Sequence, residues 1–559
     1  MGTRGAASRA LSAPVDARGL DVRALATARP ARAIAVGALL LAAIAVRTWG
    51  LPGGGPVAYD EGWSLSNGRF LVALLTHPQQ WIALRGHGHV FLFGLDWKVG
   101  YDLVLGSLVA AGVAPQDLTW FSALAGVVMV TALAALAGRR WGAPAAAVAG
   151  VAAGAAPLSI FYGHRVLSEA ACLAGLALAL LLVDRWWDAR PSRTLGSLTV
   201  AGMAATLSLN YRLLPTLLPI SLVAGWLWWY YRRHDLPPIP PVGRLALLCL
   251  VPTAAIVATY LLIGATAAVG LPHLPALVNR QFIRSGGGAP LPFAFPDFYP
   301  RTLWEFGGPA LLLATGLGLL ACLWSWKRLD PLAAIAIGGL AGTLLFFSAA
   351  HDKAPRAIAV CIPFAALVAA RGVILPRRTA LQWTAALMLC AISLAAGWTG
   401  SGFAREPSGS AQAGRWLSAH PGEIVTTRGP LFAAYAERRW DVDVAAEPDP
   451  AHRIVIPASD STISSLRHDG ARWVVVDAHA LLTSPSGIFE QLLLCGGRPA
   501  AEFNDPADWS RLQFLEEADS LHTGYNPVLL RRQQLLRASQ GQEIIRIYDL
   551  EGSGTASCD

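Results

Sequence analysis

Charged residues are scarce in this chain. Only 14% of its 559 residues are Asp, Glu, Lys or Arg, whereas 54% are hydrophobic and the mean hydropathy is +0.45. A soluble globular chain usually carries about 25% charged residues. The shortage of charge therefore excludes a protein that is water-soluble throughout, and it predicts that most of the chain lies in a membrane.

Cysteine is also sparse, with seven residues, five of which lie inside apolar runs where the thiol behaves as a small hydrophobic group. No pair has CxxC or metal-finger spacing, so the sequence supports neither a disulfide scaffold nor a zinc site. Glycine (55) and proline (37) follow no period, which excludes collagen-like and disordered chains. The net charge of +8 does not indicate nucleic-acid binding, because the basic residues are dispersed at the ends of apolar runs.

The charge is divided unevenly between the two parts of the chain. Residues 400–559 hold 14 Arg, no Lys and 21 acidic residues, a net charge of −7. Residues 1–399 hold the other 30 basic and 15 acidic residues, a net charge of +15. The chain therefore consists of a basic membrane part followed by an acidic, more polar tail.

Apolar runs of nearly membrane-spanning length recur through the first 400 residues, and they predict a polytopic α-helical membrane protein with about eleven transmembrane helices. The runs lie at 33–46, 118–138, 144–161, 166–183, 195–210, 212–230, 245–269, 307–326, 331–349, 356–375 and 379–398. A further apolar stretch, 89–114, is interrupted by charged residues. It is either a twelfth span or a helix in the membrane interface.

Charge bias decides between these two topologies, because short cytoplasmic loops are rich in Lys and Arg. The basic connectors are the N-terminal tail, Arg139–Arg140, Arg185 to Arg193, Arg232–Arg233, Lys327–Arg328, and Arg371 with Arg377–Arg378. All of these basic connectors lie on the same side of the membrane only if 89–114 does not cross it. We therefore expect that stretch to lie flat on the outer surface of the membrane. The N-terminus is then cytoplasmic and the C-terminal domain extracytoplasmic.

Three regions follow from this topology. Residues 1–32 are a disordered cytoplasmic tail, 33–398 form the transmembrane domain with a first outer loop at 47–117, and 399–559 form an extracytoplasmic α/β domain. In the tail, β-rich runs alternate with helix-like stretches, which is typical of a largely parallel sheet. The β-rich runs are 423–427, 472–477 and 544–548, and the helix-like stretches are 409–419, 460–468 and 486–494.

The first candidate for chemistry is the acidic pair Asp60–Glu61, which follows the first span on the outer side. Two adjacent carboxylates can serve as a general base and its orienting partner. A plainer interpretation is that Asp60 caps a helix in a solvated loop. The local residues alone leave both interpretations open.

The second candidate is the segment FYGHRVLSEA at 161–170, which carries His164, Arg165 and Glu169 between two spans. The spacing i, i+4 predicts that Arg165 and Glu169 share one face of a helix entering the membrane. Such a pair can bind an anionic ligand, or it can anchor the helix end by snorkelling to the interface.

The third candidate is AAHDKAPRAIAV at 349–360, where His351, Lys353 and Arg356 lie together between two apolar runs. Cationic side chains on the outer side go against the charge bias of membrane proteins, so they suggest a phosphate-binding site.

Two weaker candidates complete the set. Tyr211 and Arg212 lie on the outer side between two spans with almost no loop. His87 and His89 provide only two imidazoles, which is too few to predict a metal site, so we expect no bound metal.

The order of these motifs resembles that of the GT-C superfamily of integral-membrane glycosyltransferases, in particular the branch with protein O-mannosyltransferases and lipid A aminoarabinose transferases. The resemblance covers roughly 33–375 and is strongest over 55–185. The motifs are one span, an outer loop opening with Asp60-Glu61, apolar surface helices, a second span ending Gly138-Arg139-Arg140, and a span ending Phe161-Tyr162-x-x-Arg165 before an acidic residue.

The resemblance implies a polyprenyl-phosphate-linked sugar donor and transfer on the outer side of the plasma (inner) membrane. Asp60 matches the acidic residue that acts as catalytic base in that family, and Glu61 completes its pair. Arg165 matches the arginine near the donor phosphate, and Glu169 the acidic residue one turn later. His351, Lys353 and Arg356 occupy the late loop that helps to bind the lipid phosphate.

The chain departs from the family pattern at two places. The surface helix starts Gly88-His89-Val90-Phe91-Leu92 instead of a Pro-Pro-Leu-Tyr-Tyr-like sequence. The late loop has Pro355-Arg356-Ala357 instead of the common Arg-Tyr pair. These differences affect the acceptor and the phosphate contacts.

The hypothesis from sequence is therefore an inverting hexosyl or pentosyl transferase. Asp60 removes a proton from an acceptor hydroxyl, on a protein, lipid or glycan, as that oxygen attacks the anomeric carbon. Arg165 and the 351–356 cluster stabilise the leaving polyprenyl phosphate, so no cofactor or divalent metal is required. Two rivals remain: a multi-span transporter or flippase of lipid-linked or cell-envelope precursors, and a non-catalytic scaffold.

Overall fold

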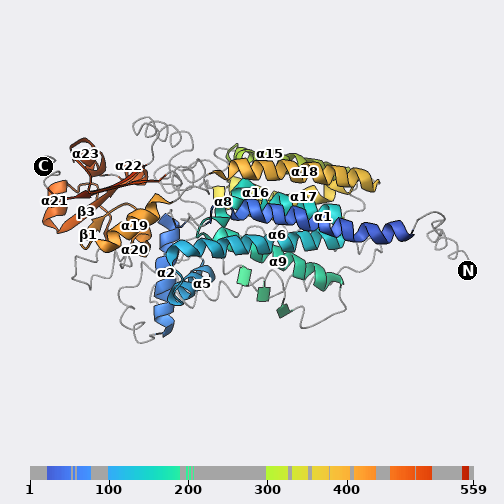
Figure 1. The fold of residues 1–559 in the computed structure, drawn as a ribbon, viewed down its shortest axis with the longest axis horizontal. Coiled ribbons are helices and arrows are strands. Elements are labelled where there is room, and N and C mark those ends of the chain that lie inside the picture. The colour runs from blue at the N-terminus through green and yellow to red at the C-terminus, as the bar shows by residue number, and fades with distance from the viewer. Residues whose placement is uncertain are drawn as a thin grey trace, which may run out of the picture.

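The helices of a membrane bundle and the strands of a mixed sheet lie at opposite ends of this chain, with two helices across the junction between them (Figure 1). The computed structural model describes residues 22–51, 55–56, 59–76, 98–188, 197–198, 201–202, 205–206, 297–324, 330–349, 355–376, 378–402, 408–435, 454–484, 486–495, 497–505 and 544–552.

The bundle contains most of the long helices. Their bounds are α1 (Val22–Thr48), α6 (Thr119–Trp141), α7 (Ala143–Gly154), α8 (Pro157–Gly163), α9 (Ser168–Asp188), α15 (Pro309–Trp324), α16 (Pro331–Ala349), α17 (Cys361–Val373) and α18 (Thr379–Gly400). The short α14 (Phe298–Thr302) continues into a π-helical turn, Leu303–Gly307, before α15.

Four helices in the described part of the chain are long and apolar enough to cross a membrane, or six if each of two bent pairs counts as one span. The chain is thus a polytopic membrane protein, but eleven spans are not established. The runs expected at 212–230 and 245–269 lie outside the described residues, as does most of 195–210.

The run expected as one span at 144–161 is broken into α7 and α8, whose axes differ by 61°. The break has a local cause, because Pro157 begins α8 and Ala156 before it is extended. Proline lacks the N–H of a continuous helix and disfavours a helical residue before it. The bend directs the sequence after α8 toward the end of the bundle that carries the sheet.

The bundle core is built largely from alanine and glycine, which lets helix backbones approach closely. A Cβ atom at Gly318 of α15 would lie 2.1 Å from the carbonyl oxygen of Val368 in α17. A Cβ atom at Gly397 of α18 would lie 2.4 Å from the carbonyl oxygen of Ala155. Small residues at these crossings supply the packing that apolar burial cannot supply in lipid.

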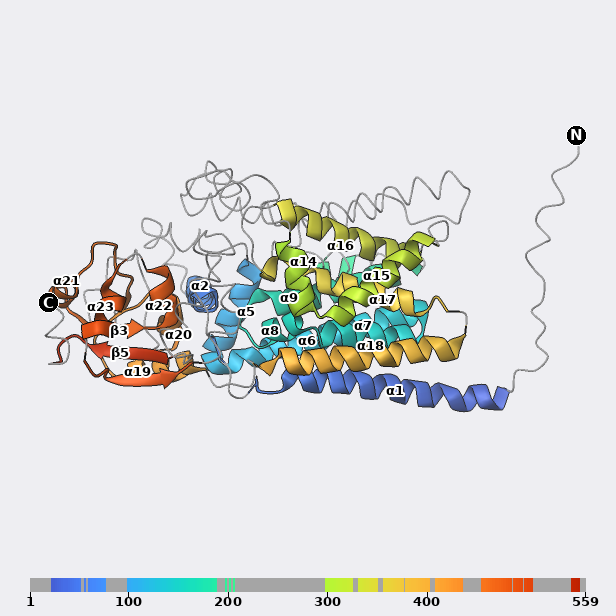
Figure 2. The same ribbon diagram turned by 90° about the horizontal axis from the view of Figure 1, so that it is seen from above.

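The basic residues that the charge analysis used gather at one end of the bundle. Arg139 and Arg140 end α6, Arg185 is in the last turn of α9, Arg371 is in the last turn of α17 and Arg378 precedes α18. This is the end where α1 begins, away from the sheet (Figure 2).

Two helices, α2 (Tyr59–Thr76) and α5 (Val99–Ala110), lie across the other end of the bundle, roughly perpendicular to its long axis (Figures 1 and 2). They pack tightly because glycines meet at their crossing: a Cβ atom at Gly106 would lie 2.0 Å from the carbonyl oxygen of Gly68. Within the stretch 89–114, the described residues form a helix only over α5, and 89–97 lies outside them.

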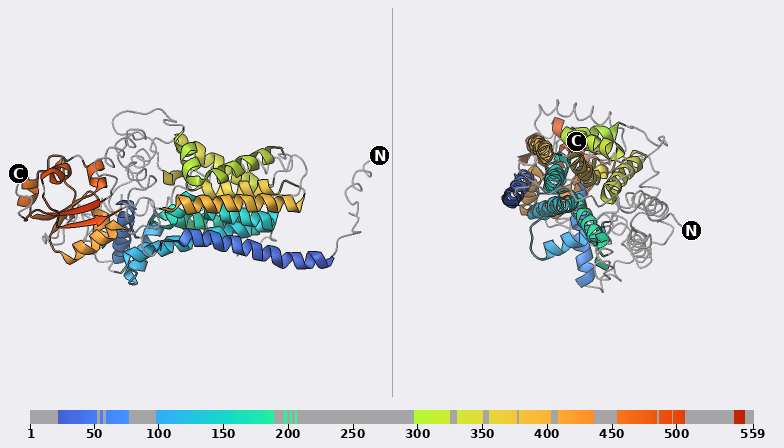
Figure 3. Two further views of the ribbon diagram at one scale, coloured as in Figure 1. Left: turned by 45° about the horizontal axis from the view of Figure 1, so that its top comes forward. Right: turned by 90° about the vertical axis from the view of Figure 1, so that its right-hand side faces the viewer.

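The sheet lies in the C-terminal part of the chain (Figure 3), and its strand order is β2-β1-β3-β5-β4. Its strands are β1 (Glu423–Val425), β2 (Ile454–Val455), β3 (Ala471–Val476), β4 (Ala501–Asn504) and β5 (Ile544–Asp549). Its helices are α19 (Gly409–Ala419), α20 (Gly429–Tyr435), α21 (Ile463–His468), α22 (Ala478–Thr483) and α23 (Ile488–Cys495).

The expectation of a largely parallel sheet is wrong. Strand β1 runs parallel to β2 and β3, but β5 runs antiparallel to both β3 and β4. The reversal arises because β5, from the end of the chain, inserts between β3 and β4, with Val474 paired to Tyr548. Buried residues on the two faces of the sheet form two separate apolar clusters, each covered by helices.

Cysteine spacing did not predict a disulfide, but Cys495 at the end of α23 is disulfide-bonded. The four cysteines described in the bundle are free and buried: Cys172, Cys322, Cys361 and Cys390.

The buried ion pair between Arg428 and Asp477 generates a prediction for stability. Nε and Nη2 of Arg428 lie 2.8 and 2.6 Å from Oδ2 of Asp477, and both side chains are about 97% buried or more. Asp477→Asn keeps the cap on α22 but leaves a buried guanidinium without its main counter-charge. We expect a loss of about 3 kcal/mol, measured by hydrogen exchange of β1 and β3 amides.

Glu502→Gln is the matched control, because it breaks the exposed Arg546–Glu502 pair of the same sheet. It should cost no more than about 0.5 kcal/mol. Equal effects of the two substitutions would contradict the assignment of Arg428–Asp477 as a core constraint.

Candidate active site

The side chains of Asp60 and Arg356 form an ion pair at the end of the bundle next to the sheet. Asp60 is in the first turn of α2, where the helix dipole favours a carboxylate. Arg356 is in η6 (Pro355–Ile358), the 3-10 turn between α16 and α17. The Asp60 side chain is 28% exposed and the Arg356 side chain 16%, so the pair is sheltered but open to a ligand.

Glu61 points the other way and is fully buried. Its Oε1 accepts a hydrogen bond from the backbone N–H of Val166, in the turn between α8 and α9. This contact ties the start of α2 to the residue that follows Arg165. We interpret Glu61 as the group that holds α2 in place, while the neighbouring carboxylate of Asp60 faces the open side.

Arg165 lies in the turn between α8 and α9, and only 3% of it is exposed. Its guanidinium carbon lies 4.9 Å from the centre of the Phe161 ring, a cation–π contact. The helix α9 begins only at Ser168, so Arg165 and Glu169 do not share a helix face as their spacing predicted. The bend at Pro157 and the short α8 end the helical geometry before Arg165.

Three acidic side chains of α2, α5 and α9 are buried in this part of the chain: Glu61, Asp102 and Glu169. Each acts electrostatically on the side chain of Tyr101, which is also buried. The amide of Asn67 donates to Asp102 Oδ2 at 3.4 Å. We call these three buried carboxylates, Glu61, Asp102 and Glu169, the acidic floor of the site.

Sequence analysis missed Arg47, the fully buried arginine at the end of α1. Its Nη1 donates to Ser159 Oγ at 2.7 Å, and its carbonyl oxygen accepts from His164 Nε2 at 2.6 Å. Gly126 and Gly163 leave room for the guanidinium, because Cβ atoms there would lie 1.8 Å from Nε and 2.6 Å from Nη2.

Arg47 therefore braces the turn that carries His164 and Arg165. The sequence holds one signal for Arg47, its position at the end of a span on the side that the topology predicts to be outer. The same signal drew attention to Arg356.

The remaining predicted site residues cannot be placed here. His351, Lys353, Tyr211 and Arg212 lie outside the described residues. In the part of the chain that the structure describes, no group of three or more His, Cys, Asp or Glu side chains has the geometry of a metal site.

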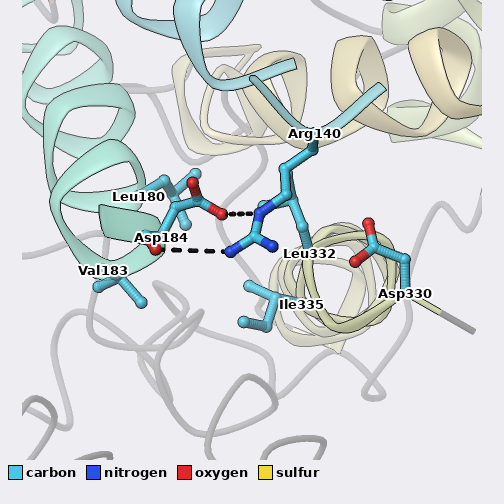
Figure 4. Close-up of a pocket in the computed structure, with 7 residues that line it drawn as sticks. All are labelled: Arg140, Leu180, Val183, Asp184, Asp330, Leu332 and Ile335. Atoms are coloured by element: carbon cyan, nitrogen blue, oxygen red, sulfur yellow. Dashed lines mark hydrogen bonds and ion pairs between the residues drawn. The ribbon is translucent and has the colours of Figure 1, made fainter. Parts of the chain in front are cut away.

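A pocket at the far end of the bundle is not the candidate site (Figure 4). The pocket lies at the C-terminal end of α6, whereas the candidate site lies toward its N-terminal end. At 1.5 Å per residue, the 23 residues of α6 separate these two ends by about 34 Å. The charged groups of the pocket have partners already: Arg140 donates to both a carboxylate oxygen and the carbonyl oxygen of Asp184, and Asp330 accepts from Nε1 of Trp141. The pocket is lined by Arg140, Leu180, Val183, Asp184, Asp330, Leu332 and Ile335.

The buried contact of Glu61 generates a prediction. Glu61→Ala leaves the buried N–H of Val166 without its acceptor, which should cost about 1–3 kcal/mol. Glu61→Gln keeps an acceptor oxygen and should lose less than half as much. Thermal unfolding of the purified protein in lipid nanodiscs measures both. A loss that is equal for Ala and Gln would show that the charge, and not the hydrogen bond, is what matters.

No protein-family model matches the chain, and no curated protein matches it in sequence. Among solved structures it is similar to ArnT from Cupriavidus metallidurans bound to undecaprenyl phosphate, with a TM-score of 0.53 and 17% identity over 80% of this chain and 94% of that one. The apo state of that ArnT gives a TM-score of 0.52 and 17% identity over 81% and 94%.

AglB, an oligosaccharyltransferase from Archaeoglobus fulgidus in complex with a dolichol-phosphate, is more distant. Its TM-score is 0.47, with 11% identity over 81% of this chain and 70% of that one. The match to ArnT extends over most of both chains. The chain therefore has the fold of ArnT from Cupriavidus metallidurans, and this is the kind of fold that the motif resemblance implied.

Proposed function

We propose that this chain is a membrane glycosyltransferase that moves a sugar from a polyprenyl-phosphate donor to an acceptor hydroxyl. The observation that carries the proposal is the contact between Asp60 and Arg356, which lie 296 residues apart. It joins the expected base to the expected phosphate ligand at one end of a bundle whose fold is that of ArnT. That ArnT was crystallised with undecaprenyl phosphate.

The reaction is a single displacement with inversion. The acceptor oxygen attacks the anomeric carbon, its proton passes to Asp60, and the bond from that carbon to the phosphate oxygen breaks. Negative charge grows on the departing phosphate. Arg356, next to Asp60, and Arg165, in the turn below, are the cations suited to stabilise that charge.

The other residues have supporting roles. Glu61 and His164 bond to backbone groups and hold α2 and the turn after α8 in position. Glu169, buried in the first turn of α9, contributes to the acidic floor. We extend the phosphate-binding role to His351 and Lys353, and a supporting role to Tyr211 and Arg212, on the sequence pattern alone.

The proposed orientation places the site outside the plasma (inner) membrane. The arginine-rich ends of α6, α9, α17 and α18 then face the cytoplasm, in agreement with the charge bias of membrane proteins. The disulfide at Cys495 favours an oxidising compartment for the sheet. Both observations support a cytoplasmic N-terminus and an extracytoplasmic C-terminal domain.

A transporter is less well supported by the buried charges. Arg47, Glu61 and Arg165 gather at one end of the bundle and make contacts there. An ion or substrate pathway instead places ionisable groups along the membrane interior. The arrangement described here suits a reaction at one surface of the membrane.

The base assignment predicts the effect of Asp60→Asn, which removes the proton acceptor but keeps the shape of the side chain. We expect transfer from a radiolabelled polyprenyl-phosphate sugar to fall by about 10²–10⁴-fold. Asp117→Asn is the control, because Asp117 is an exposed acid in η2 (Pro115–Leu118) near the same end of the bundle. Near-normal turnover by Asp60→Asn would reject the assignment.

The mechanism also predicts insensitivity to chelators. Arginines neutralise the leaving phosphate, so an excess of EDTA over trace divalent ions should leave the transfer rate within about twofold of its starting value. Loss of turnover on chelation that Mg²⁺ or Mn²⁺ restores would show that a divalent ion takes part, and the donor site would then need a metal.

A further inference from the structure

Helix α20 of the C-terminal sheet region packs directly on α2 beside the acidic pair. The closest approach is at Gly62, the residue after Glu61. A Cβ atom there would lie 2.2 Å from the backbone nitrogen of Leu431 and 2.4 Å from its Cα. Only glycine allows this backbone contact, so the position of α20 and the position of Asp60 depend on each other.

Two hydrogen bonds hold α20 along α2. The hydroxyl of Tyr435 donates to the carbonyl oxygen of Pro56 at 2.7 Å, just before α2 begins. Nη2 of Arg69 donates to the carbonyl oxygen of Ala434 at 3.3 Å, in the middle of α2. Gly55 has a φ of +154°, and a Cβ atom there would lie 2.4 Å from the Tyr435 hydroxyl oxygen. Contacts thus flank Asp60 on both sides along the chain.

The end of α20 also joins the apolar cluster beneath the site. Ala434 belongs to the same buried cluster as Leu65 of α2, Tyr101 of α5 and Val166. Val166 is the residue whose N–H donates to Glu61. The helix from the C-terminal region is therefore part of the packing that fixes α2, and not a separate surface laid over it.

The sheet holds α20 rigidly from its other end. Arg428, the residue before α20, is bonded to Asp477 at the end of β3, and its Nη2 lies 3.9 Å from Asp505 Oδ2. Asp505 in turn accepts from the backbone N–H groups of Gly409 and Ser410 at the start of α19. The ionic network connects α20 to the residues that follow β3 and β4 and to the start of α19.

We propose that α20 is a positioning element for Asp60, with Tyr435 and the Gly62–Leu431 contact as the positioning residues. This inference rests on the proposed function, because it assigns the C-terminal region a part in that same reaction. A general base must hold its place to within a fraction of an ångström. Helix α2 lies across the bundle end, and its start is tied to the bundle through the bond from Val166 to Glu61. Helix α20 supplies a second constraint from the opposite side of the junction.

Two variants test the proposal in the full-length protein in nanodiscs. Tyr435→Phe removes only the hydroxyl that bonds to Pro56, and Gly62→Ala forces α2 and α20 apart. We expect kcat to fall about threefold for Tyr435→Phe and at least about tenfold for Gly62→Ala. The KM for the donor and the binding of polyprenyl phosphate should stay within about twofold, because Arg165 and Arg356 belong to other elements.

Matched controls separate positioning from a general loss of stability. Tyr548→Phe removes a buried hydroxyl from β5, away from α2, and Gly316→Ala adds a methyl group in α15 where no atom lies within 4 Å. Both should leave kcat unchanged. Hydrogen exchange across 59–76 should rise in Tyr435→Phe and not in Tyr548→Phe.

The outcomes distinguish this inference from the proposed function. Wild-type protein that turns over no donor in a panel of polyprenyl-phosphate sugars refutes the proposed function. The exchange measurement then still tests the contact between α20 and α2. If the wild type is active, unchanged kcat in both variants overturns the positioning role. A parallel change in kcat, KM and unfolding temperature overturns it as well, because that pattern indicates a structural role only.

Discussion

The contact between Asp60 and Arg356 is the interaction on which the rest of the account depends. It joins the start of α2, which lies across the bundle end, to a 3-10 turn between two bundle helices. Each partner reaches the pair only if its own surroundings are correct: α2 must pack on α5, and α16 and α17 must close on the core. The opposite charges also keep the carboxylate and the guanidinium aligned with each other.

Burying a charged side chain costs free energy, and several charged side chains are buried at this end of the bundle. Arg47, Glu61 and Arg165 are each at most 3% exposed. Each of the three makes a specific contact: a serine hydroxyl for Arg47, a backbone N–H for Glu61 and an aromatic ring for Arg165. Glycines and alanines elsewhere in the bundle permit the close packing that stabilises such an arrangement. We infer that function, rather than stability, accounts for the clustering of these charges.

The local parts of the site could be predicted from the sequence, and the long-range parts could not. Asp60 stands out as part of an acidic pair in the loop after the first apolar run, and Arg165 and Arg356 stand out as ionisable residues at the ends of apolar runs. Arg47 has the same signal but no motif around it, and the glycines that receive it come from two distant helices. The α20–α2 contact and the insertion of β5 between β3 and β4 join segments far apart in the chain, so no local pattern encodes them. The break at Pro157 could have been predicted from the sequence, because a proline at this position disfavours a continuous helix.

The most direct test of the central claim is a structure of the protein in lipid with bound polyprenyl phosphate, determined by electron cryomicroscopy. The account predicts phosphate density within hydrogen-bond distance of Arg356 and close to Asp60, at the bundle end that carries α2. Phosphate density at the opposite end, beside Arg139 and Arg140, would contradict it. So would a lipid phosphate at the α2 end that leaves the Asp60–Arg356 pair more than about 10 Å away, a separation at which exposed charges are largely screened.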